Sequence, residues 1–413
     1  MRHLSGVVAF TLVFVLCGFS QNGSAKSAHR QFAIDTSAQG TDASAPSVSQ
    51  TPTYTVLHTF SGSDGAFPNP DLVRDASGNL FGTTNSGGDL KCGGGYGCGV
   101  AFKLDPSGKE SLLHVFTTGP GGLTPTSGLI QDSLGNLYGT TFNGSNGFAA
   151  GVAYRIATNG GFKELLNFGS VPGGGYYPFA GLSRDAAGNL YGITQAGGPF
   201  GNSGAIYKLD AKGNETVLHG FYDVAHGLPG YAGLVSDAAG NLFGTADGGN
   251  PSLPLGVVYE LDNKGNFKVL HTFSPNDGSA PENTIIRDSA GSLYGTTLTA
   301  GHFGWGTIFK ANAKGSFRVL HHFNCATDGG GPGPVVLDAA GNLYGTTYQC
   351  GAPNLGTIFK LAPNGRFTVL YTFAGGAEGQ NPVSVTLGSD GNLYGAARIG
   401  SNRDGVLFML KLH

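Results

Sequence analysis

A five-residue motif, Gly-Asn-Leu-aromatic-Gly, occurs seven times in the chain of 413 residues. The copies start at Gly78, Gly135, Gly188, Gly240, Gly291, Gly341 and Gly391, and Ser292 is the only replacement of the asparagine. Successive copies are 50 to 57 residues apart. A constant period of this size is typical of solenoids, propellers and other repeat arrays. The content of one period therefore decides the fold.

Each period contains four short apolar segments separated by turn residues. In the sixth period they are Pro334–Asp338, Asn342–Tyr348, Gly356–Leu361 and Phe367–Phe373. They are rich in β-branched and aromatic residues and too short for helices, which predicts four strands, A to D. Asp-x-x-Gly-Asn joins A to B, and the same pattern joins C to D, as in Asp210–Asn214. Such sequences form tight hairpins, so each period predicts one antiparallel propeller blade.

The two ends of the repeat region complement each other. A copy of strand D, Tyr54–Phe60, precedes the first strand A, whereas the last period ends after strand C, Gly405–Lys411. A solenoid would instead need atypical capping repeats. The sequence therefore predicts an all-β, seven-bladed β-propeller of four-stranded antiparallel blades, closed by the N-terminal strand joining the last blade.

The composition agrees with this fold and excludes several others. Glycine makes up 73 of 413 residues, far above the average of about 7 %, which argues against a helical protein. Charged residues amount to only 12 % and the net charge is −3, so neither an acidic disordered chain nor a nucleic-acid binder is expected. Of the 44 aromatic residues, 21 recur on strands B, C and D, where we expect them in the core.

The N-terminus has the features of a secretory signal. Arg2 and His3 precede an apolar run of 13 residues, Val7–Phe19, and Gly23-Ser24-Ala25 supplies small residues for cleavage. The run is shorter than the roughly 20 residues that span a bilayer, so no membrane span is expected in the mature chain. We predict a signal peptide at residues 1–25, a disordered linker at 26–53 and the propeller at 54–413, in a secreted or periplasmic bacterial protein.

The repeat also resembles a known family. Strand D is followed by Asp-Gly-x-x-Pro, then by Asp-x-x-Gly-Asn-Leu-Tyr-Gly-Thr-Thr and Gly-Thr-Ile-Phe-Lys-Leu, over Tyr54–Leu412. This pattern is similar to the GloVer tandem-repeat family of secreted bacterial proteins, and the blade plan resembles NHL-type propellers. The resemblance implies the fold and export, and it implies no particular reaction.

Four cysteines remain once Cys17 is removed with the signal. Cys92 and Cys98 share one B–C loop, while Cys325 and Cys350 lie in the D–A and B–C loops of one blade. In an oxidising compartment we expect the pairs Cys92–Cys98 and Cys325–Cys350. A zinc site built from all four is the weaker alternative, because the two pairs come from different blades.

Function is sought on the face formed by the B–C and D–A loops, since these loops vary while the hairpins on the other face are uniform. The variable loops carry aromatic residues, of which we propose five as ligand-binding: Tyr96, Tyr176, Tyr177, Trp305 and Tyr348. Exposed rings stack on sugars or anchor protein partners. The alternative is that each ring packs on its own glycine-rich loop.

The D–A loops also carry acids before a proline, Asp64, Asp277, Asp328 and Glu378. Asp-Gly followed by proline is ordinary turn chemistry. An acidic arc that holds a structural Ca²⁺ is the alternative, because Ca²⁺ takes oxygen ligands from several loops. No other cofactor is expected.

Histidines recur on strand D at positions 58, 114, 219, 271 and 321, and Asn167 and Tyr371 are expected at the same position in two further strands. Because these strands belong to separate blades, we expect edge residues rather than a metal site. A lyase or hydrolase site would instead draw on loop residues of blades 4 and 5, namely His226, His302, Asp223 and Asp247. No spacing among them is diagnostic of an enzyme.

The leading hypothesis is therefore a secreted binding module, monomeric, whose partner is an extracellular glycan or protein. The enzyme is the second hypothesis, and a purely structural envelope protein is the third.

Overall fold

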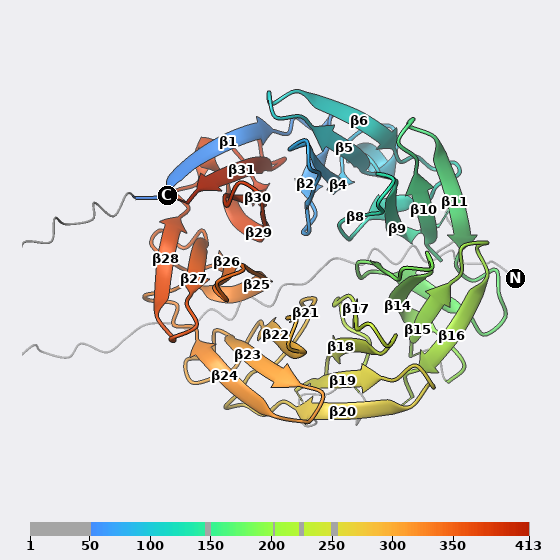
Figure 1. Ribbon diagram of the computed structural model, residues 1–413. Helices are drawn as coiled ribbons and strands as arrows, with labels where there is room; N and C mark the ends of the chain where they lie inside the picture. The colour runs from blue at the N-terminus through green and yellow to red at the C-terminus, as the bar shows by residue number, and fades with distance from the viewer. Residues whose placement is uncertain (1–50, 145–149, 201–202, 223–226, 249–254, 413) are drawn as a thin grey trace, which may run out of the picture. The chain divides into compact units, whose positions relative to one another are not determined.

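The computed structural model describes residues 51–412 except 145–149, 201–202, 223–226 and 249–254. Seven small antiparallel sheets follow one another around a ring (Figure 1), which confirms the predicted propeller. The predicted signal peptide and nearly all of the predicted linker lie outside the described residues. In the part of the chain that is described, no helix has the length and apolarity needed to cross a membrane.

Each blade runs from strand A beside the central channel to strand D at the outer edge. Blade 1 comprises β2 (Ala66–Pro68), β3 (Val73–Arg74), β4 (Leu80–Ser86), β5 (Val100–Leu104) and β6 (Glu110–Val115). Blade 2 comprises β7 (Leu123–Pro125), β8 (Ile130–Gln131), β9 (Leu137–Asn143), β10 (Val152–Ile156) and β11 (Phe162–Asn167). Blade 3 comprises β12 (Gly175–Pro178), β13 (Ser183–Arg184), β14 (Leu190–Gly197), β15 (Ala205–Leu209) and β16 (Glu215–Gly220).

Blade 4 comprises β17 (Val235–Ser236), β18 (Leu242–Ala246), β19 (Val257–Leu261) and β20 (Phe267–Thr272). Blade 5 comprises β21 (Ile286–Arg287), β22 (Ser292–Thr297), β23 (Thr307–Asn312) and β24 (Phe317–His322). Blade 6 comprises β25 (Gly330–Leu337), β26 (Leu343–Gln349), β27 (Thr357–Leu361) and β28 (Phe367–Thr372). Blade 7 comprises β29 (Gln380–Leu387), β30 (Leu393–Ile399), β31 (Val406–Lys411) and β1 (Thr53–Thr59). Two 3₁₀ turns, η1 (Gly93–Gly95) and η3 (Gly376–Glu378), lie in loops.

Strand A is interrupted in blades 1 to 3, where it forms two short pieces. A proline ends the first piece in each case, and a proline has no N–H to donate to the sheet. A proline recurs at this place in later blades too, and in six blades the residue before it has a positive φ and donates its N–H to a carbonyl of the preceding blade. In blade 3 this residue is Tyr177, which has φ +60° and whose backbone nitrogen lies 3.0 Å from the Ala150 oxygen. This recurring bond links neighbouring blades beside the channel.

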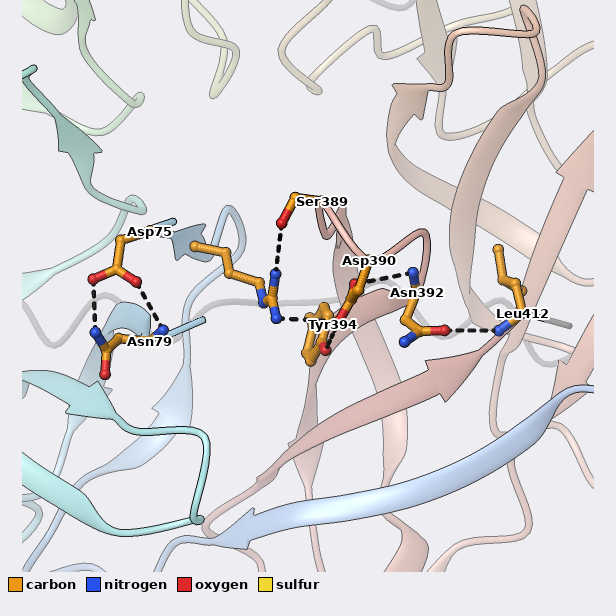
Figure 2. Close-up of polar contacts among 8 residues, drawn as sticks. Asp75, Asn79, Ser389, Asp390, Asn392, Tyr394 and Leu412 are labelled. Atoms are coloured by element: carbon orange, nitrogen blue, oxygen red, sulfur yellow. Dashed lines mark hydrogen bonds and ion pairs between the residues drawn. The ribbon is translucent and has the colours of Figure 1, made fainter. Parts of the chain in front are cut away.

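The Asp-x-x-Gly-Asn hairpins form as predicted. In the A–B hairpin of blade 1, Asp75 accepts bonds from the backbone and side-chain nitrogens of Asn79 at 2.9 and 2.7 Å (Figure 2). Gly78 has φ +84°, a conformation that side chains rarely adopt. In five blades the hydroxyl of the strand B tyrosine also bonds to the hairpin aspartate, as for Tyr394 and Asp390 at 2.6 Å. The hairpin face is therefore fixed by one repeated network.

In the core of each blade, the aromatic ring of strand C lies against the glycine of strand B. A Cβ added to Gly82 would lie 2.6 Å from the Phe102 ring, so only glycine allows this approach. The same contact occurs at the strand B glycine of every blade. The strand C ring and the phenylalanine that ends strand D are buried in all seven blades, which confirms their predicted place in the core.

The N-terminal strand closes the ring. β1 pairs antiparallel with β31, from Thr53 opposite Lys411 to Thr59 opposite Val406, and completes blade 7 as predicted. Tyr54 stacks on Tyr371 of blade 6, with ring centroids 4.3 Å apart. On the hairpin face, Arg74 of blade 1 reaches the Asp390 carboxylate of blade 7 at 3.1 Å. The two ends of the chain are thus joined by a sheet, a stack and an ion pair.

Both predicted disulfides are present. Cys92–Cys98 closes one B–C loop, and Cys325–Cys350 joins the D–A and B–C loops of blade 6. Two disulfides are typical of proteins in an oxidising compartment.

The strand D histidines lie at the outer edge and contact the next blade. The rings of His114, His219, His271 and His321 stack on the first residue of strand D in the following blade, with centroids 3.4 to 4.2 Å apart. In blade 2 the equivalent residue is Leu166, because its pairing with Ala153 matches that of His271 with Val258. The expectation for Asn167 was therefore wrong by one residue, which places Asn167 on the opposite face of the strand.

Candidate functional site at the channel mouth

Four aromatic side chains from three consecutive blades meet where strand B ends and strand A begins. Phe142 at the end of β9 stacks on Tyr177 of β12, with ring centroids 4.9 Å apart. The Phe142 ring also meets Phe179 edge to face at 5.7 Å, and Phe179 meets Tyr231 at 4.4 Å. We call Phe142, Tyr177, Phe179 and Tyr231 the aromatic arc. All four are partly or well exposed, and Tyr231 keeps 40 % of its surface accessible.

The backbone holds Tyr177 in this position. Its positive φ turns the side chain out of the regular alternation of the strand, and Pro178 follows directly. The strained conformation is supported by the bond from its N–H to the Ala150 carbonyl of blade 2. The ring is therefore fixed before any ligand arrives.

Two carboxyl groups continue the arc beyond Tyr231. Asp247 follows β18, and its backbone forms a two-bond bridge with Leu228. Glu282 lies just before strand A of blade 5. Burial, and then the charge of Asp247, raise the pKa of Glu282 to about 7; burial also raises the pKa of Asp247. We call Asp247 and Glu282 the acid pair.

Tyr231 connects the arc to the acid pair. Burial raises the pKa of its hydroxyl, and the nearby charges of Glu282 and Asp247 add to this shift. The side chain of Gln195 in blade 3 opposes the shift and lowers the pKa of this hydroxyl. The arrangement thus offers flat apolar faces on one side and hydrogen-bonding oxygens on the other.

These residues occupy two positions of the repeat that change from blade to blade. Phe179, Tyr231 and Glu282 each stand three residues before the apolar residue of strand A, at Leu182, Leu234 and Ile285. The residue three positions after the strand B glycine is equally variable: Asn85, Phe142, Gln195, Asp247, Leu298, Tyr348 and Arg398. Phe142 and Glu282 were missed by sequence reasoning, and this alignment of variable positions is the signal that could have found them.

The residues predicted to bind a ligand lie in different places. Tyr177 belongs to the aromatic arc. Tyr96 is 75 % exposed within the Cys92–Cys98 loop, and Tyr176 covers Gly169 and Gly197. Trp305 packs against the core between blades 5 and 6 and covers Gly330 beside Cys350. Tyr348 is partly buried, and its carbonyl accepts a bond from Asn381.

Each of the four predicted acids forms an ion pair or a hydrogen bond with a residue of the preceding strand D. Asp64, Asp277 and Asp328 lie 2.9 to 3.2 Å from His58, His271 and His321, and Glu378 accepts a 2.6 Å bond from Tyr371. Burial lowers the pKa of His271 and His321, while the partner aspartate opposes this shift. The structure therefore distributes these acids over four separate blade junctions and does not bring them together.

The predicted enzyme residues are likewise not assembled within the described residues. His302 is exposed and stacks on His322, with ring centroids 3.7 Å apart. Asp247 belongs to the acid pair, and no described contact joins it to His302. His226 and Asp223 lie outside the described residues.

A hollow of about 590 Å³ lies on the opposite face, between the A–B hairpins of blades 5 and 6. Arg287, Asp288 and Asp338 are among the residues that line it. Its polar lining includes Asp288 and Asp338, and an aspartate recurs at this position in six of the seven A–B hairpins. The channel-mouth residues, by contrast, are particular to their blades, so we place the candidate site there.

Comparison with solved structures finds proteins of similar fold at low sequence identity. A candidate 6-phosphogluconolactonase from Bacteroides uniformis is 16 % identical, with 73 % of this chain and 84 % of that chain covered and a TM-score of 0.50. A gluconolactonase from Xanthomonas campestris is 14 % identical, covering 88 % and 90 %, with a TM-score of 0.44. Regucalcin, a calcium-binding protein from Agrobacterium tumefaciens, is 14 % identical, covering 86 % and 92 %, with a TM-score of 0.44. At these identities the likeness concerns the fold alone.

No curated protein matches the sequence. A family model, the Gloeobacter/Verrucomicrobia repeat, matches residues 90–282 and 252–413. The two matches span most of the chain and confirm the resemblance drawn from the repeat motifs. The protein is therefore a member of the Gloeobacter/Verrucomicrobia repeat family.

Proposed function

We propose that the protein is a secreted carbohydrate-binding propeller that holds a glycan across the aromatic arc and the acid pair. The observation that carries the proposal is the continuity of the two features. Phe142 contacts both Tyr177 and Phe179, and Phe179 contacts Tyr231. The charges of Asp247 and Glu282 act on the Tyr231 hydroxyl. Export is supported by the predicted signal peptide and by the two disulfides.

A sugar suits this surface because a pyranose ring has an apolar C–H face and a rim of hydroxyl groups. The rings of the arc offer apolar faces, and the carboxyl oxygens of the acid pair accept hydroxyl hydrogen bonds. A protein partner is the less favoured ligand, since stable protein interfaces bury about 800 Å² on each side and favour a continuous apolar patch.

A second function is favoured by one property of Glu282. Its pKa of about 7 is in the range that a general acid needs at neutral pH, and Asp247 beside it is a carboxyl group in a different environment. Paired carboxyls with separated pKa values carry out acid–base cleavage of glycosidic bonds. The second candidate is therefore a glycan hydrolase or lyase at the same site.

The test is a panel of soluble polysaccharides, assayed for binding by calorimetry and for cleavage by release of reducing ends. The double variant Phe179→Ala/Tyr231→Ala removes the centre of the arc. Its matched control is Phe200→Ala/Tyr222→Ala, which removes another exposed pair in edge-to-face contact, with centroids 5.4 Å apart. Binding lost only in the first variant supports the proposal, and binding lost equally in both contradicts it. Reducing ends released by the wild type but not by Glu282→Gln would establish the second function.

A further inference from the structure

The junction that closes the ring, between blades 7 and 1, differs from the five junctions at which aromatic rings stack. At four junctions a strand D histidine stacks on a phenylalanine of the next blade, and at a fifth Tyr371 stacks on Tyr54. Between blades 7 and 1, the residue that faces His58 is Glu110 instead of an aromatic ring. A carboxylate therefore replaces the apolar partner at this junction.

Glu110 joins a histidine–aspartate pair that is already present. His58 Nε2 lies 3.2 Å from Asp64 Oδ2 and 3.9 Å from Glu110 Oε2. One ligand atom from each of the three residues can be chosen so that all lie within 4.8 Å of one another. Asp64 is oriented by Ser61, whose backbone N–H donates to Oδ1 at 2.7 Å and leaves Oδ2 toward the histidine.

The three side chains are largely buried, with exposed fractions of 16 % for His58, 23 % for Asp64 and 11 % for Glu110. Oε1 of Glu110 and Nε2 of His58 are inaccessible to solvent and form no hydrogen bond. At the His271 and His321 junctions, the histidine Nε2 is instead hydrogen-bonded to its aspartate. Buried polar atoms that form no hydrogen bond are rare, and a bound ion would account for both of these.

We propose that His58, Asp64 and Glu110 bind a zinc ion. Imidazole and carboxylate are common zinc ligands at about 2.0–2.2 Å, and tetrahedral ligands at that radius lie a little over 3 Å apart. The 3.2 Å between His58 and Asp64 fits this spacing, and the 3.9 Å between His58 and Glu110 needs a contraction of about half an ångström. A water molecule would complete a four-coordinate site. A calcium ion suits the cluster less well, because it prefers six or more oxygen ligands and one of these ligands is nitrogen.

A zinc ion at this site would link the N-terminal strand to blade 1. His58 belongs to β1, Asp64 to the loop that enters blade 1, and Glu110 to β6 of blade 1. The ion would connect the N-terminal strand, already paired with β31, to the first blade. Because a metal that binds only the folded state stabilises it, zinc should raise the melting temperature of the whole ring.

The test is a titration of the full-length chain with ZnCl₂ after removal of metals by a chelator, followed by calorimetry and thermal unfolding. The informative variant is Glu110→Phe, because phenylalanine is the residue that the other junctions use and should stack on His58. Asp64→Asn is the second variant. Asp328→Asn is the matched control at the junction of blades 5 and 6, where Phe367 leaves no third ligand.

We expect the wild type and Asp328→Asn to bind one zinc ion that raises the melting temperature. We expect Glu110→Phe and Asp64→Asn to lose that ion while remaining folded in the chelator. A wild-type chain that binds no zinc, or a Glu110→Phe chain that binds it as tightly as the wild type, would overturn the proposal. Glycan binding does not enter this test, so its result is independent of the proposed function.

Discussion

The imidazole ring of His271 lies parallel to the phenyl ring of Phe317, with centroids 3.4 Å apart and an angle of 4° between the planes. The two residues come from the outer strands of consecutive blades. Phe317 also meets Phe273 edge to face and Phe309 in an offset stack, so one ring connects the outer edge of blade 4 to the core of blade 5. The outer stacks thus hold neighbouring blades together at the rim, far from the channel.

Removal of one stacked ring should destabilise the ring as a whole. For Phe317→Ala we expect the free energy of unfolding to fall by about 2–4 kcal/mol, through lost burial and a new cavity. Urea denaturation measures this change. Phe303→Ala is the control, because Phe303 is 54 % exposed and should change stability by no more than about 0.5 kcal/mol. An equal effect of both substitutions would show that the stack contributes nothing specific.

The fold could be predicted because each repeated residue does the same physical work in every blade. The Gly82 position admits a ring in all seven blades, and an aspartate equivalent to Asp75 closes six of the seven A–B hairpins, so the copies give the same answer. The aromatic arc could not be predicted in this way, since Phe142 and Tyr177 meet only through the packing of two blades. The acids were ambiguous for a related reason. A carboxylate such as Asp277 has the same sequence context whether it binds a cation or bonds to His271 of its own strand.

Deletion of the closing strand should unfold the propeller. A chain that starts at residue 61 lacks β1, which leaves β31 with an unpaired edge and removes the stack of Tyr54 on Tyr371. A chain that starts at residue 51 keeps both. We expect the shorter chain to melt at a clearly lower temperature, or to aggregate, and the longer one to melt like the full-length chain. Equal melting temperatures by circular dichroism would contradict closure by this strand.

The Cys325–Cys350 disulfide should be readable through Trp305, the only tryptophan of the chain. A Cβ added at Gly330 would lie 2.6 Å from the Trp305 ring and 3.1 Å from Cys350 Sγ, so the indole lies beside the disulfide. Disulfides quench indole fluorescence. The Cys92→Ser/Cys98→Ser variant keeps only the Cys325–Cys350 disulfide. Mild reduction of this variant should therefore increase the tryptophan emission and lower the free energy of unfolding by about 3 kcal/mol. Cys325→Ser/Cys350→Ser should show no such response; emission that rises equally in both would assign the quenching elsewhere.

The acid pair should make stability depend on pH. The pKa of Glu282 is raised from about 4.5 to about 7, so between these values the unfolded chain loses a proton that the folded chain keeps. The stabilising contribution of Glu282 to the free energy of unfolding is therefore complete below about pH 4.5. It is lost as the pH rises toward 7, by up to about 3 kcal/mol. Glu282→Gln should be the more stable chain at pH 8, and the difference should shrink toward pH 4.5. Urea midpoints at both pH values measure this.

A control with the opposite sign is available on the hairpin face. Hydrogen bonds from the Asn266 side chain and backbone lower the pKa of Asp262. Its contribution is present above the ordinary aspartate pKa and is lost as the pH falls below it. Asp262→Asn should therefore lose stability at pH 8 relative to the wild type. A Glu282→Gln profile parallel to that of Asp262→Asn would show that Glu282 is ionised in the folded protein.

The aromatic arc should contribute unequally to glycan binding. Tyr231 is the most exposed of the four rings of the arc. The charges of Glu282 and Asp247 also act on its hydroxyl. A ligand that covers both features must cross Tyr231, so Tyr231→Ala should weaken binding by about 1–3 kcal/mol, or roughly 5- to 150-fold. Tyr231→Phe keeps the stacking face and removes only the hydroxyl, so it should lose much less. Calorimetry against a polysaccharide identified by the panel gives both values. If Tyr231→Phe weakens binding as much as Tyr231→Ala does, the hydroxyl carries the contact, and the stacking on which the glycan assignment rests is wrong.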